Sequence, residues 1–276
     1  MEKKRILFVS QEIYPFLAKT EISHNARKLP QGTQENGKEI RVFTPRFGSI
    51  NERRHQLHEV IRLSGMNIII DDNDHPLIIK VASIPAARLQ VYFIDNDEFF
   101  KRKTNVTDDK GADFTDNDER SMFFCRGVLE TVKKLGWKPD VIHCHGWMTS
   151  LMSLYIKKIY NKDPHFADTK VVYSIYDDKE GFESPWDERF HEKLKFDGFD
   201  EEVTNLVKTP TLDAITKAAV TFSDGVIQSS EVIQPELQKV YDDATCLKLN
   251  YLPEEHLTKG LSEFFDKVIE EGILIQ

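Results

Sequence analysis

The chain has 276 residues, of which 40% are hydrophobic and 30% are charged. This balance predicts a globular protein with a substantial core and excludes a disordered chain. The 46 acidic and 37 basic residues give a formal net charge of −9, which argues against a nucleic-acid-binding surface.

Targeting signals are not evident in the sequence. The apolar run near the start is interrupted by Gln11 and Glu12 and has no small-residue cleavage site after it, so no signal peptide is expected. No stretch approaches the roughly 18–20 apolar residues of a membrane span. The three cysteines are odd in number and widely spaced, which is typical of a reducing compartment. We therefore expect a cytoplasmic protein that contacts neither membrane nor nucleic acid.

Short apolar runs predict the strands. Most of them are nearly continuous rather than alternating, which is typical of parallel strands covered on both faces. The predicted strands are residues 5–10, 40–45, 89–95, 140–145, 170–176 and 225–230.

Helical patterns lie between these strands. Residues 118–135 place their apolar side chains on one face, with Asp116 or Asp118 as the N-terminal cap and Gly136 as the stop signal. Further amphipathic helices are predicted over residues 147–160 and 212–222 and near the end of the sequence, within residues 256–276.

Two regions depart from the strand–helix alternation. Residues 57–94 contain several strand-like runs with turn signals such as "DDND", which predicts a β-meander joined to the sheet. Residues 177–211 are rich in charges and aromatics without a clean period, and we expect a long excursion with one or two helices. With no repeat and no linker, residues 1–276 are expected to form a single α/β domain with a Rossmann-like, mostly parallel sheet and helices on both faces.

The segment "HCHGW", His143 to Trp147, is the strongest candidate site. It ends a predicted strand and begins a helix, which is where ligands bind in open α/β sheets. His143 and His145 share one side of the strand, so they could hold a metal together, but no third ligand stands at a diagnostic spacing. The alternatives are a ligand-facing His145, or one packed, hydrogen-bonded histidine with the other capping the loop.

Other familiar chemistries are not supported. The sequence contains neither G-x-G-x-x-G nor a Walker A motif, no G-x-S-x-G, and no calcium-loop register in the acidic run 108–120. In "PFLAKTEI", Lys19 and Thr20 suggest a phosphate loop, but Glu21 and Ile22 stand where such loops need glycines. We therefore expect no metal and no cofactor.

Five segments together resemble the bacterial glycogen synthase and plant starch synthase family. They occur in the family's order and span roughly residues 5 to 235. They are "RILFVSQEIYPFLAKT", "IRVFTPRFGSI", "VYFIDNDEFFKR", "WKPDVIHCHGWMTSL" and "ITKAAVTFSDGVIQSSE".

This resemblance implies the N-terminal half of a GT-B glycosyltransferase. In that family, glucose passes from ADP-glucose to the non-reducing end of an α-1,4-glucan with retention of configuration. The family's Lys-Thr-Gly-Gly loop approaches the donor, and the histidine of its H-D-W-H motif lies near the transferred glucose. Carried over, the ligand-binding residues are Glu12, Lys19, Thr20, His145 and Trp147.

The departures from the family pattern lie at the cleft-facing positions. Glu21 and Ile22 replace the two loop glycines; a side chain there blocks close backbone approach, and a carboxylate repels a diphosphate. H-D-W-H becomes His145-Gly146-Trp147-Met148, and the T-V/I-H-N segment becomes Ser174-Ile175-Tyr176-Asp177.

The length also departs from the family, because residues 1–276 leave no room for a donor-binding second half. We therefore name no catalytic residue and do not expect autonomous catalysis. One hypothesis is a synthase component whose donor half comes from another polypeptide. The second is a non-catalytic module, regulatory or binding an α-glucan or maltooligosaccharide, and the third is an assembly module that forms a homodimer.

Overall fold

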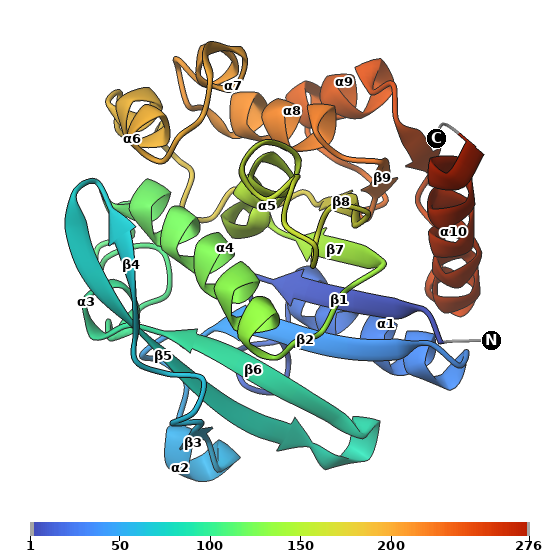
Figure 1. The fold of residues 1–276 in the computed structure, drawn as a ribbon, viewed down its shortest axis with the longest axis horizontal. Coiled ribbons are helices and arrows are strands. Elements are labelled where there is room, and N and C mark those ends of the chain that lie inside the picture. The colour runs from blue at the N-terminus through green and yellow to red at the C-terminus, as the bar shows by residue number, and fades with distance from the viewer. Residues whose placement is uncertain (1–2, 275–276) are drawn as a thin grey trace.

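The computed structural model describes residues 3–274 (Figure 1). The strands are β1 Arg5–Ser10, β2 Glu39–Pro45, β3 His58–Glu59, β4 Met66–Ile70, β5 Asn73–Ile84, β6 Leu89–Asp95, β7 Val141–His145, β8 Lys170–Ile175, β9 Gly225–Gln228 and β10 Leu247–Leu249. The α-helices are α1 Glu21–Glu35, α2 Glu52–His55, α3 Asp97–Phe100, α4 Asn117–Lys134, α5 Leu151–Leu154, α6 Phe190–Phe196, α7 Glu201–Leu206, α8 Leu212–Thr221, α9 Pro235–Asp243 and α10 Glu254–Leu274.

One sheet organises the described chain, with the strand order β10-β9-β8-β7-β1-β2-β6-β5-β3. The strands from β10 to β6 are parallel, whereas β5 runs antiparallel to β6, β3 and β4. The chain starts in the middle, proceeds from β1 to β2 on one side, and later returns to β7 on the other. The strand order therefore reverses between β1 and β7, and such a switch point leaves a crevice at the carboxyl ends of the strands.

Helices cover both faces of the sheet (Figure 1). α4, α5 and α8 lie on one face, and α1 lies on the other, where it packs against α10. The two helices pack tightly at Gly32, where an added Cβ atom would lie 2.0 Å from Thr258 Cγ2. Phe265 of α10 reaches the sheet and packs edge-on against Phe8. α10 is thus part of the core that supports β1.

The predicted strands and the β-meander are confirmed. The long apolar runs are buried on both faces, as expected of strands in a covered sheet. The single helix predicted over residues 147–160 is wrong. This segment begins with a 3₁₀ turn, Trp147–Thr149, continues as the short α5, and ends as a π-helix, Tyr155–Ile159. Its apolar side chains are buried against α4 and α8, so packing on several sides sets the local winding.

The capping prediction for α4 is right in position and wrong in mechanism. Asp116 occupies the N-cap position, but its side chain makes no capping hydrogen bond. It instead pairs with the Arg102 guanidinium, with Oδ1 2.8 Å from Nη1. Gly136 follows the helix with φ of +61°, as expected of a glycine stop signal.

The excursion over residues 177–211 carries α6 and α7, as predicted. Two buried features hold it down. Lys193 of α6 lies 2.6 Å from Asp118 and 2.7 Å from Glu119 of α4. Trp186 packs edge-on against Trp147, which begins the segment after β7. The excursion is therefore anchored next to the switch point.

No helix within residues 3–274 is long and apolar enough to cross a membrane.

Candidate functional site at the sheet switch point

The carboxyl ends of β1 and β7 meet at the switch point. The backbone N–H of Gln11, just after β1, donates to the carbonyl of His145 at the end of β7, with an N–O distance of 3.1 Å. Two segments rise above this edge, residues 11–22 after β1 and residues 177–183 after β8. We call the surface formed by these two segments the switch-point face.

Glu12 and Thr20, both predicted site residues, lie together on this face. The Thr20 hydroxyl donates to Glu12 Oε1 over 2.6 Å. Thr20 also caps α1, accepting the Ser23 N–H at 3.0 Å, while its own N–H donates to Ser23 Oγ at 2.8 Å. Burial, together with the nearby carboxylates of Asp178 and Glu180, raises the pKa of Glu12 to about 7 despite the lowering effect of the Thr20 hydrogen bond.

The two residues that replace the family's glycines are built into the fold. Glu21 opens α1, and its carboxylate accepts a hydrogen bond from Ser230 Oγ in the loop after β9. Ser230 Oγ in turn accepts the backbone N–H of Asp177 at 3.0 Å. Ile22 is 2% exposed and belongs to the core, whereas Lys19 is exposed. The Glu21 carboxylate therefore links the N-terminus of α1 to the loop after β9 through Ser230.

Three site residues come from contacts that the sequence pattern does not show. Gln11 donates from Nε2 to Asp178 Oδ2 over 2.9 Å, although 167 residues separate them. Asp178 Oδ1 accepts the backbone N–H of Glu180 at 3.1 Å. Burial raises the pKa of Asp178, while the hydrogen bonds from Glu180 and Gln11 lower it. From the sequence, only its position could have indicated Asp178, because it comes soon after β8, whose carboxyl end lies at the same edge of the sheet.

These groups surround a small acidic hollow of about 20 Å³. That volume takes one water-sized group, such as a single hydroxyl. The hollow is lined by Gln11, Glu12, Phe47, Asn105, Val106, Asp178 and Glu180.

His143 and His145 project from β7 to the same side, as predicted, with ring centroids 4.0 Å apart. Both are fully buried, and their partners are Ser174 Oγ and Tyr176 Oη, each at 2.8 Å. Burial lowers the pKa of His145 to about 3 and that of His143 well below its ordinary value, so both rings are neutral at pH 7. Because residues 3–274 contain no group of three or more metal-ligating side chains, the pair is a packed, hydrogen-bonded one.

Tyr176 controls access to His145. The tyrosine is itself 5% exposed, and its hydroxyl bonds His145 Nδ1 while also accepting from Asn25 Nδ2 at 3.4 Å. His145 Nε2 is buried without a hydrogen-bond partner. In this conformation no surface of His145 faces solvent, so a ligand reaches the ring only if surrounding side chains, such as Tyr176, move.

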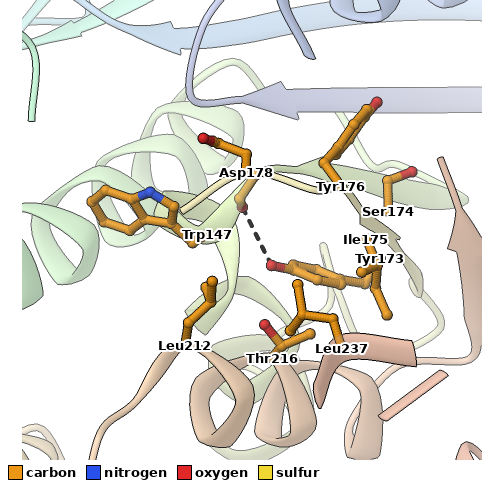
Figure 2. Close-up of a pocket in the computed structure, with 10 residues that line it drawn as sticks. Trp147, Tyr173, Ser174, Ile175, Tyr176, Asp178, Leu212, Thr216 and Leu237 are labelled. Carbon is orange, nitrogen blue, oxygen red and sulfur yellow. Dashed lines mark hydrogen bonds between the residues drawn. The ribbon is translucent and has the colours of Figure 1, made fainter. Parts of the chain in front are cut away.

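Trp147 contacts residues 177–183, the segment after β8 that we call the acidic segment. It is 2% exposed, and its Nε1–H donates to the carbonyl of Glu180 over 2.8 Å. The hollow beside it has a volume of only about 10 Å³. Figure 2 shows the side chains around that hollow and the hydrogen bond of the Tyr173 hydroxyl to the Gly146 carbonyl, at 3.5 Å. This second hollow is therefore smaller than the acidic one, which has a volume of about 20 Å³.

The switch-point face carries a negative charge. Its two segments contain six carboxylates and two lysines, and Lys179 pairs with Glu183 at 3.5 Å. Lys19 is the remaining cation of these segments. The six carboxylates are Glu12, Glu21, Asp177, Asp178, Glu180 and Glu183.

Comparison with known proteins decides the family. The model of the starch synthase catalytic domain family matches residues 5–249. The chain belongs to this family. Glycogen synthases from Chlorobium limicola and Chlorobaculum tepidum are each 39% identical to it over 173 residues, or 62% of this chain. The matched region is 35% and 36% of those two proteins, so this starch synthase family chain spans about a third of the length of its curated relatives.

A solved structure carries the same fold. The catalytic domain of starch synthase IV from Arabidopsis thaliana, bound to ADP and acarbose, superposes with a TM-score of 0.65 at 18% identity. The superposition covers 98% of this chain and 50% of that one. It confirms the predicted α/β fold of one synthase half.

Proposed function

We propose that residues 1–276 bind a neutral α-1,4-glucan at the switch-point face and do not by themselves transfer glucose from ADP-glucose. The observation that carries the proposal is the set of carboxylates around the acidic hollow. Carboxylate oxygens accept hydrogen bonds from sugar hydroxyls, and the hollow has room for one such hydroxyl. Acarbose, a sugar analogue, is bound in the related Arabidopsis structure, which supports a glucan as the ligand class.

The same charges disfavour the sugar-nucleotide donor. Transfer from ADP-glucose needs cations or N–H donors that stabilise the leaving diphosphate. Lys19 is one such cation, but Glu12 is hydrogen-bonded to the next residue, Thr20, and Glu21 lies two residues after Lys19. Thr20 also already takes the Ser23 N–H at the N-terminus of α1. A diphosphate at this end of α1 would therefore meet carboxylates.

In this proposal Glu12, Asp178 and Glu180 contact the sugar, and Thr20 orients Glu12. Trp147 holds the segment of Glu180, and Lys19 lies at the rim. His145 contributes to binding only through the Tyr176 hydroxyl that covers it. These roles follow from the contacts described above.

Titration calorimetry with maltohexaose and with ADP-glucose tests the proposal. We expect heat from maltohexaose alone, and loss of that heat in the double variant Asp178→Ala with Glu180→Ala. Glu59→Ala, at an exposed carboxylate of β3, is the matched control and should bind as the wild type does. Heat from ADP-glucose, glucose transfer onto glycogen by the isolated chain, or no maltohexaose binding would each contradict the proposal.

A further inference from the structure

Gln11 connects three separate segments through one buried side chain. The residue is 7% exposed. Its Nε2 donates to Asp178 Oδ2 at 2.9 Å, and its Oε1 accepts the backbone N–H of Met148 at 3.2 Å. Both ends of the amide are therefore used, one toward the acidic segment and one toward the 3₁₀ turn after β7.

The space for this side chain depends on Gly146. Glycine at this position has φ of +84°, where other residues are strained. A Cβ atom here would lie 2.3 Å from both Cδ and Oε1 of Gln11, which is far inside contact distance. A side chain at residue 146 would therefore push the Gln11 amide away from Asp178.

Asp178 connects Gln11 to the rest of the acidic segment through hydrogen bonds. Its Oδ2 takes the Gln11 hydrogen bond, and its Oδ1 takes the backbone N–H of Glu180 at 3.1 Å. The carbonyl of Glu180 is held by the Trp147 indole at 2.8 Å. Gln11 thus begins a chain of hydrogen bonds that holds the Asp178 carboxylate and the backbone of Glu180, two residues that line the acidic hollow.

We propose that Gln11 is the positioning residue of the switch-point site, and that Gly146 is its structural partner because it leaves room for the Gln11 amide. Gln11 orients Asp178 and Glu180 so that both carboxylates accept hydroxyls of the same sugar. This role rests on the glucan binding proposed above, but the positioning of Asp178 is measurable without any ligand.

The ligand-free test is a carboxyl NMR titration of Asp178 in the wild type and in Gln11→Met, which keeps the side-chain length and removes the amide. A hydrogen bond to the ionised carboxylate lowers its pKa, so Asp178 should titrate at a higher pH in the variant. The matched control is Gln238→Met, because Gln238 donates to Asp242 on the exposed face of α9 at 2.9 Å and does not reach the site. An unchanged titration of Asp178 in Gln11→Met would overturn the proposal.

A second variant tests the pairing with Gly146. Gly146→Ala should raise the pH at which Asp178 titrates, as Gln11→Met does, because its methyl group displaces the same amide. In the double variant the two shifts should not add, since the Asp178 hydrogen bond is lost only once. Additive shifts would show that the two residues act on Asp178 independently and would overturn the pairing.

Binding of maltohexaose gives the functional readout. Loss of a positioned hydrogen-bond acceptor should weaken binding by about tenfold in Gln11→Met, with the urea midpoint used to confirm that the variant is folded. Wild-type affinity in a variant whose Asp178 titration has shifted would refute the positioning role. If the wild type itself binds no maltohexaose, the proposed function fails, and the Asp178 titration still decides whether Gln11 restrains Asp178.

Discussion

Replacing Glu12 by glutamine should stabilise the protein at alkaline pH and change little at acidic pH. The Glu12 carboxyl is largely buried beside Asp178 and Glu180, and burial, with these neighbours, raises its pKa from 4.5 to about 7. Glutamine keeps the shape and still accepts the Thr20 hydroxyl, but it carries no charge. The variant therefore isolates the cost of ionising Glu12 inside the fold.

The sign and size of this difference in the free energy of unfolding follow from the linkage between proton binding and folding. Between pH 4.5 and about 7 the folded protein holds a proton on Glu12 that the unfolded chain has released, so the free energy of unfolding falls as pH rises. The pKa difference of about 2.5 units corresponds to about 3.5 kcal/mol at most, because each unit contributes about 1.4 kcal/mol. Partial solvent access to Glu12 reduces this to about 2–3 kcal/mol.

Urea unfolding of wild type and Glu12→Gln at pH 4.5 and pH 8 measures this difference. Titrating groups that do not interact with Glu12 cancel when the two proteins are compared at the same pH. The variant should gain about 2–3 kcal/mol over the wild type between these two pH values. The exposed Glu59→Gln substitution provides the control, with no pH-dependent gain. A Glu12→Gln difference that is the same at both pH values would refute the reasoning.

Three further changes test the packing that supports the site. Gly32→Ala should lower stability by about 1–3 kcal/mol in thermal unfolding, and Thr258→Ala should rescue it, because the new methyl group meets Thr258. Lys193→Met should cost about 3–5 kcal/mol in urea unfolding, since it leaves Asp118 buried and unpaired; a loss below 1 kcal/mol would contradict the ion pair. Trp147→Phe should weaken maltohexaose binding in calorimetry without abolishing folding, because it removes the indole hydrogen bond to Glu180 and part of the ring packed against Trp186. Unchanged binding would remove Trp147 from the account.

Much of the fold was predictable because buried parallel strands leave a strong mark on the sequence. Continuous apolar runs located β1, β2, β6, β7, β8 and β9, and the glycine at residue 136 located the end of α4. The segment after β7 was not predictable in the same way. Its apolar residues fit a helical period, but contacts with α4 and α8 impose 3₁₀ and π winding that periodicity does not encode.

The sequence indicated the location of the candidate site better than it indicated the residues that form it. The position of His145 at the end of a strand indicated the sheet edge at which the candidate site is proposed, and Glu12 and Thr20 meet there. Gln11 and Asp178 carry no motif, and their contact spans 167 residues, so only the folded sheet brings them together. The sequence could not show that the Tyr176 hydroxyl is hydrogen-bonded to the buried His145 ring, because this depends on the side-chain packing at the end of β8.

A crystal of the chain soaked with maltohexaose and ADP together tests the central proposal most directly. We predict glucan density against Glu12, Asp178 and Glu180, and no ADP density beside Lys19. Density for ADP at the N-terminus of α1, or glucan bound only away from the switch-point face, would contradict the account.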